Sequence, residues 1–87
     1  MAIYAVHRKL PGISMEDLGN AQKLAIQTGE KMTAEGKPVS YVKSQFYPGN
    51  STCTCFFESD NENAVKELNQ SASLPFDTIE EVLELNP

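Results

Sequence analysis

The sequence predicts an α+β protein of the ferredoxin-like class, a β-α-β-β-α-β sandwich with two helices on one face of a four-stranded antiparallel sheet. Segments typical of strands and of amphipathic helices follow one another in this order. Two right-handed crossovers around a central hairpin generate that sandwich. The chain has 87 residues, which leaves room for a single domain, residues 1–87.

The first third of the chain is expected to form a strand and a long helix. Residues 2–8 carry good strand formers in an apolar run that is too short for a helix. Ser14 has the chemistry of an N-cap, which predicts a helix over 15–35 that Gly36 ends. Small and apolar side chains recur there at spacings of three and four, and should let the helix lie close to a sheet. This stripe consists of Leu18, Ala21, Ala25, Gly29 and Met32.

Residues 39–47 and 52–58 are predicted to form the central hairpin, because both are rich in aromatic and β-branched residues. The residues between them, Pro48 to Ser51, have turn chemistry. If Gly49 and Asn50 form a two-residue turn, cross-strand partners have numbers that sum to 99. The pairs predicted from that register are Ser44 with Cys55, Phe46 with Cys53, and Val42 with Phe57.

The same register places Tyr41, Lys43 and Gln45 on the opposite face, beside Thr54 and Phe56. The aromatic residues on that face, with Tyr4 as a further candidate, would form an apolar patch, and such patches usually mark a contact surface. We therefore expect a homodimer joined through sheet faces or edges, of the dimeric α+β barrel type.

The last part of the chain is expected to form a helix and a strand. Residues 61–72 are predicted as a helix that Ser59 and Asp60 cap, with an apolar stripe at helical spacing. Residues 79–85 alternate well enough to be a fourth strand. Glu81 is then an acidic residue on an otherwise apolar face, and we expect it either to lie at the sheet edge or to have a basic partner such as Arg8 or Lys43.

Composition excludes several classes of function. Seven basic against twelve acidic residues give a net charge of −5, which argues against nucleic-acid binding. No apolar stretch is long enough to cross a membrane. The N-terminus has no features of a signal peptide, so we expect a cytoplasmic protein whose Cys53 and Cys55 are reduced.

Few residues could bind a metal. Nickel and zinc accept imidazole and thiolate ligands, and the chain has one histidine and two cysteines. Because the first and third strands are neighbours in this fold, His7 and Cys55 could approach one another, with Glu81 as a third ligand. The alternatives are a packed, structural role for the cysteines and a nucleophilic Cys55–His7 pair that Glu81 orients.

The chain also resembles a family of small bacterial proteins of unknown function with ferredoxin-like fold, some of whose members are described as nickel-binding. The resemblance covers nearly the whole chain and rests on the order of several short segments. These are Tyr4-x-Val6-x-Arg8 with Pro11-Gly12, Tyr41-Val42-Lys43-Ser44, Cys55-Phe56-Phe57-Glu58, Leu74-Pro75, and Ile79-Glu80-Glu81-Val82. By this resemblance, Cys55, Ser44 and Glu81 match polar positions of the family pattern. The chain departs from that pattern at two positions, because the family often has an acidic residue in place of His7 and a histidine in place of Lys43.

Three functions remain open from the sequence. The first is a small cytosolic dimeric binding protein without catalysis, with a weak or vestigial divalent-metal site for nickel or another ion at His7, Cys55 and Glu81. The second is a small-molecule enzyme or carrier of the dimeric α+β barrel type, monooxygenase-like, with a cavity between sheet and helices. The third is a purely structural interaction module. The fold alone does not decide between them.

Overall fold

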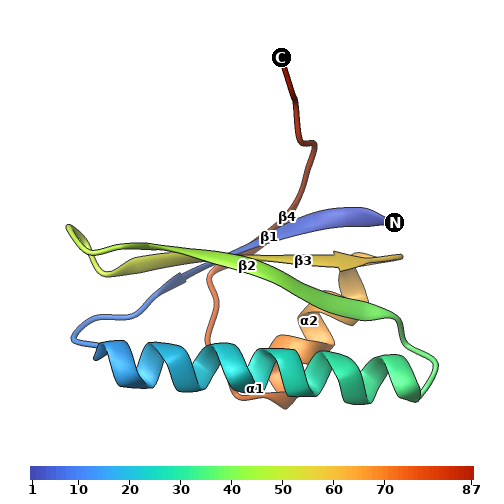
Figure 1. Cartoon of the computed structure of the whole chain (residues 1–87), viewed down its shortest axis with the longest axis horizontal. Helices are drawn as coiled ribbons and strands as arrows, with labels where there is room; N and C mark the ends of the chain where they lie inside the picture. Colours follow the sequence, from blue (N-terminus) through green and yellow to red (C-terminus); the bar gives the residue numbers. More distant parts are fainter.

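The computed structural model describes all 87 residues and has the predicted β-α-β-β-α-β order. The strands form one antiparallel sheet in the order β2-β3-β1-β4, and both helices cover the same face of it (Figure 1). The ferredoxin-like prediction is therefore confirmed. The elements are β1 (Ala2–Lys9), α1 (Met15–Ala34), β2 (Val39–Tyr47), β3 (Thr52–Ser59), α2 (Glu62–Ser71) and β4 (Thr78–Val82). Neither helix is long and apolar enough to span a membrane.

The pairing of β1 with β3 decides which side chains face the helices. Val6 lies directly opposite Cys55, and Arg8 lies opposite Cys53. Side chains alternate along a strand, so these four share the face toward the helices. His7 pairs with Thr54, and both point to the other face, which we call the outer face.

The hairpin register is correct near the turn and wrong beyond it. Ser44 pairs with Cys55 as predicted, although the loop spans residues 48–51 rather than forming a two-residue turn. A β-bulge between Tyr41 and Lys43 then shifts the register, so that Tyr41 rather than Val42 lies opposite Phe57. One extra residue in a strand moves the following side chains to the opposite face. Tyr41 therefore lies on the helix-covered side.

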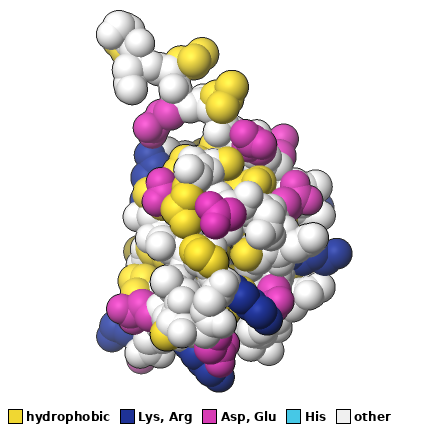
Figure 2. All heavy atoms as spheres, turned by 90° about the vertical axis from the view of Figure 1, so that its right-hand side faces the viewer, with side chains coloured by type: hydrophobic (Ala, Val, Ile, Leu, Met, Phe, Trp, Pro, Cys, Tyr) yellow, Lys and Arg dark blue, Asp and Glu magenta, His cyan; other side chains and the backbone are white.

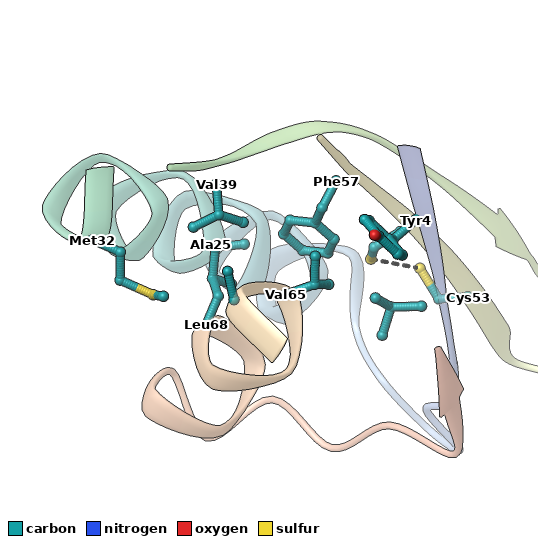
Figure 3. Packing of buried hydrophobic residues seen from close by; sticks show 11 residues of the cluster. Tyr4, Ala25, Met32, Val39, Cys53, Phe57, Val65 and Leu68 are labelled. Carbon is teal, nitrogen blue, oxygen red and sulfur yellow. Dashed lines mark hydrogen bonds between the residues drawn. The ribbon is translucent and has the colours of Figure 1, made fainter. Parts of the chain in front are cut away.

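The core lies between the sheet and the two helices. Figure 3 shows the Phe57 ring near the middle of the buried cluster, with Tyr4 and Cys53 on one side and Ala25 and Val39 on the other. The Tyr4 side chain is thus part of the core, not of an outer aromatic patch. Of the three aromatic residues assigned to the outer face, only Phe56 stays there.

Gly29 allows α1 to pack closely on β2 and α2. A Cβ atom at this position would lie 3.0 Å from the carbonyl oxygen of Val39 and 3.4 Å from Leu68 Cδ1. The stripe of small residues predicted for α1 is therefore used for a close helix–sheet approach. Ser14 caps α1 as predicted, since its side chain accepts a hydrogen bond from the Asp17 amide.

The second half of the chain differs from the prediction in two places. Asn61, rather than Ser59 or Asp60, is the N-cap of α2. Its Oδ1 accepts a hydrogen bond from the backbone N–H of Ala64, with an N–O distance of 2.8 Å. The fourth strand ends at Val82, and residues 83–87 leave the body of the molecule (Figure 1). Hydrophobic side chains stand out on this tail at the top of Figure 2, and Leu83 and Leu85 are 80% and 89% exposed.

Candidate functional site

A cavity of about 220 Å³ lies between α1 and the helix-facing side of the sheet. Most of its wall is apolar, and the polar groups come mainly from β1, β2 and β3. We call it the Arg8 cavity, after the one charged residue in its wall. Its apolar wall includes Leu10, Leu18, Ala21, Ala25, Phe46 and Leu74. A concave, mostly apolar space with a few polar groups is the usual form of a small-ligand site.

Arg8 is buried at the cavity although it carries a charge. Its side chain is 4% exposed. One terminal nitrogen donates to Asn69 Oδ1 at 2.8 Å, and the other donates to the Pro75 carbonyl at 3.0 Å. The Nε atom is buried and has no hydrogen-bond partner. Both acceptors are neutral, so the guanidinium has no carboxylate partner in the chain.

A row of hydrogen bonds crosses the same cavity wall. Gln22 Nε2 donates to the Tyr41 hydroxyl at 2.8 Å, and that hydroxyl lies 2.6 Å from Ser44 Oγ. Ser44 in turn donates to Cys55 Sγ at 3.0 Å. The sulfur of Cys53 follows at 3.8 Å from Cys55 Sγ. The bulge in β2 is what brings Tyr41 into this row.

The Cys53 thiol is protonated at neutral pH. Burial raises its pKa from 9.0 to about 11, and the neighbouring Cys55 adds to the rise, while Arg8 and Ser44 act in the opposite direction. A thiol attacks and ligates as the thiolate, so Cys53 is a poor nucleophile near pH 7. Cys53 and Cys55 are both free.

The three predicted metal ligands do not come together within one chain. His7 lies on the outer face, where its Nδ1 is 3.0 Å from Thr54 Oγ1 and its Nε2 is 2.8 Å from Glu80 Oε1. Cys55 lies on the helix-facing side. Glu81 lies opposite Tyr4 on the edge strand β4, is exposed, and forms no ion pair.

The same placement contradicts a nucleophilic pair of Cys55 and His7, because the sheet separates the two side chains. The His7 ring is instead hydrogen-bonded through Nε2 to Glu80 Oε1 at 2.8 Å, and Glu80 is the neighbour of the predicted ligand Glu81. Of the two alternatives for Glu81, the structure has the position at the sheet edge, because β4 is an edge strand. Arg8 is not its partner, since the guanidinium donates to Asn69 and Pro75.

The residues present do not fit a closed nickel or zinc site. No three histidine, cysteine, aspartate or glutamate side chains gather where they could hold an ion. The sulfurs of Cys53 and Cys55 have a suitable spacing: at a metal–sulfur distance of about 2.3 Å, atoms 3.8 Å apart subtend roughly 110°. Two donors are fewer than a structural site needs, and Arg8 places a positive charge on the same cavity wall.

Sequence reasoning missed the polar side of the cavity. Arg8 was expected only as part of the family resemblance and as a candidate partner for Glu81, and no role in a site was expected for Asn69. One signal was present, because Arg8 continues the alternation of Tyr4 and Val6 on β1 and so falls on the core-facing side. A charged residue in that position of a buried face is unusual and points to a partner or a function.

Comparison with known proteins gives the chain its family. The family model described as "Nickel responsive protein SCO4226-like" matches residues 4–82. The crystal structure of SCO4226 from Streptomyces coelicolor A3(2) is similar, with a TM-score of 0.83 at 20% sequence identity over 98% of this chain and 100% of that one. That structural likeness shows the shared fold. No curated protein matches the chain in sequence. Because the family model covers most of its length, the chain belongs to the SCO4226-like family of nickel responsive proteins.

Proposed function

We propose that this protein is a non-catalytic binding protein whose ligand, a small organic molecule, occupies the Arg8 cavity. The observation that carries the proposal is the cavity itself: about 220 Å³, mostly apolar, with one buried cation and a row of hydrogen-bonding groups in its wall. Such a space holds a ligand by apolar burial and orients it through the few polar groups.

Binding is favoured over catalysis by the state of the candidate reactive groups. The pKa of Cys53 is raised to about 11 by burial, so its thiol is rarely ionised at neutral pH. The one histidine of the chain lies on the outer face and cannot serve as a base for either cysteine. These two observations argue against a cysteine nucleophile with a histidine base. Of the enzyme and the carrier left open by the sequence, we therefore propose the carrier.

Family membership supports a role for this binding in the response of the cell to nickel. We propose that any direct binding of nickel or another divalent metal is weak. Cys53 and Cys55 offer two sulfurs at a chelating distance, and further ligands would have to come from another chain. His7 lies on the opposite face of the sheet from Cys55, and Glu81 lies on the edge strand β4, and neither joins the two sulfurs in a group of ligands within one chain.

We further propose that the protein is a cytoplasmic homodimer. Its free cysteines are typical of a reducing compartment. The outer face carries a hollow lined by Ile3, Val42, Phe56 and Val82, and the exposed leucines of the tail adjoin it at Leu83. These apolar groups support an interface between two chains. Of the aromatic residues that the sequence indicated for it, Phe56 lines this hollow and Tyr4 and Tyr41 do not.

The test of the proposed function is an NMR titration with two small probes, hexanoate and 1-hexanol. Binding of either probe should shift the amide signals of residues around the cavity. The variant Ala21→Leu fills part of the cavity, and it should weaken that binding at least tenfold, a change of about 1.4 kcal/mol. Ala34→Leu makes the same change at an exposed position of α1 and should leave binding unchanged. If neither probe shifts the cavity signals, the proposed function is wrong.

A further inference from the structure

The buried charge of Arg8 is not compensated by any acidic group of the chain. Glu67 contacts Lys37 and Glu80 contacts the His7 ring, and no carboxylate lies within ion-pair distance of Arg8. Asp77 borders a second, shallower groove beside Arg8 but forms no ion pair with it. Removing a charge from water is costly unless an opposite charge or good hydrogen bonds replace the water. Arg8 has only two neutral acceptors.

Arg8 lines the cavity, and three of its N–H donors have no partner within the chain. A guanidinium has five N–H donors, and two of them are used by Asn69 and Pro75. Nε–H has no partner, and each terminal nitrogen keeps one hydrogen. A planar fork of this kind matches the two oxygens of a carboxylate better than it matches a single neutral acceptor.

The rest of the wall favours an anion with an apolar body. No aspartate or glutamate lines the Arg8 cavity, although the chain has twelve acidic residues and a net charge of −5. The cavity wall therefore has no carboxylate that would repel a bound anion or neutralise the charge of Arg8. The surrounding leucine, alanine and phenylalanine side chains can cover hydrocarbon.

We propose that Arg8 binds the carboxylate of a small apolar monocarboxylic acid in this cavity. The inference rests on the proposed function and names the ligand class for that site. A volume of about 220 Å³ lies below the roughly 300–1,000 Å³ of pockets for drug-sized ligands, so a short aliphatic or single-ring acid fits and a long-chain fatty acid does not. The apolar part lies against α1, and the carboxylate lies at β1.

The experiment compares hexanoate with 1-hexanol by NMR titration of the wild-type protein. The two probes have the same hydrocarbon chain and differ in the charged group. Hydrogen bonds to a charged partner contribute about 1.5–3 kcal/mol, so hexanoate should bind at least tenfold more tightly than 1-hexanol. Because this comparison needs no substitution, it stands even if a variant at Arg8 does not fold.

Arg8→Met then tests the assignment to Arg8, with Lys9→Met as the matched control. Both changes remove one positive charge, but Lys9 is exposed and lies outside the cavity wall. Arg8→Met should remove the preference for hexanoate, and Lys9→Met should keep it within twofold.

Three results would overturn the inference. Equal affinity of the wild type for both probes leaves the cavity as a binding site but shows that it does not select an anion. An equal loss in Arg8→Met and Lys9→Met shows that hexanoate responds only to net charge. The absence of any binding refutes both the inference and the proposed function.

Discussion

The protonated state of Cys53 can be tested by thiol labelling across pH. Only the thiolate reacts with iodoacetamide. Because the pKa of Cys53 is raised from 9.0 to about 11, the thiolate fraction below pH 9 is about 100-fold smaller in the folded protein than in the unfolded one. Native Cys53 should therefore be labelled at least about 100-fold more slowly at pH 8 than in urea. Tandem mass spectrometry separates its product from that of Cys55.

The dependence on pH is as informative as the rate. Labelling of native Cys53 should rise about tenfold for each pH unit up to the raised pKa near 11, whereas the unfolded thiol should level off above pH 9. A cysteine introduced at the exposed position Ser40, as Ser40→Cys, serves as an internal control for the reagent. Native labelling within tenfold of the unfolded rate would show that Cys53 is accessible and ionised, and would remove the argument against catalysis.

The same pKa shift affects stability. Between pH 9 and about 11 the unfolded chain has lost the Cys53 proton while the folded protein still holds it. The folded state therefore binds more protons in this window, and the free energy of unfolding should decrease as pH rises through it. The contribution is fully present below pH 9. Urea denaturation of the wild type and of Cys53→Ala measures the difference.

The remaining predictions concern metal, packing and assembly. Calorimetry should detect only weak nickel binding, which Cys55→Ser reduces and His7→Ala leaves unchanged; tight binding, or binding that depends on His7, would contradict the ligand placement. Gly29→Ala should lower the free energy of unfolding by about 1 kcal/mol, because overpacking against the β2 carbonyl outweighs the gain in helix propensity. Gly19→Ala, which has open space, should not be destabilising in the same urea titration. Light scattering should give about twice the chain mass of 9.6 kDa, and Phe56→Lys should reduce it; a monomeric wild type would refute the dimer.

The element order and most boundaries could be predicted from the sequence because they depend on local patterns. Ser14 at the start of α1 and the small residues along that helix are local signals of this kind. The bulge at Val42 could not be predicted, because an extra residue in a strand is stabilised by contacts with distant residues. One such contact is the edge-on packing of the Tyr41 and Phe57 rings, with centroids 5.7 Å apart.

The candidate site was harder to predict for a related reason. A hairpin turn limits the register of β2 and β3, but no turn joins β1 to β3, so their register depends on how the core packs. Only that register shows that Val6, and not His7, lies opposite Cys55. Likewise, the sequence gives no sign that Asn69 on α2 accepts a hydrogen bond from Arg8 on β1. The cavity follows from these long-range contacts.

The most direct test of a ligand site at Arg8 is the NMR signal of the Arg8 Nε–H group during addition of hexanoate. This donor is buried and has no partner in the free protein. The account predicts that its proton signal moves strongly downfield and exchanges more slowly with water as the carboxylate binds, and that ligand protons show contacts with Ala25 of α1. An Nε–H signal that stays unchanged while hexanoate binds elsewhere would contradict the account.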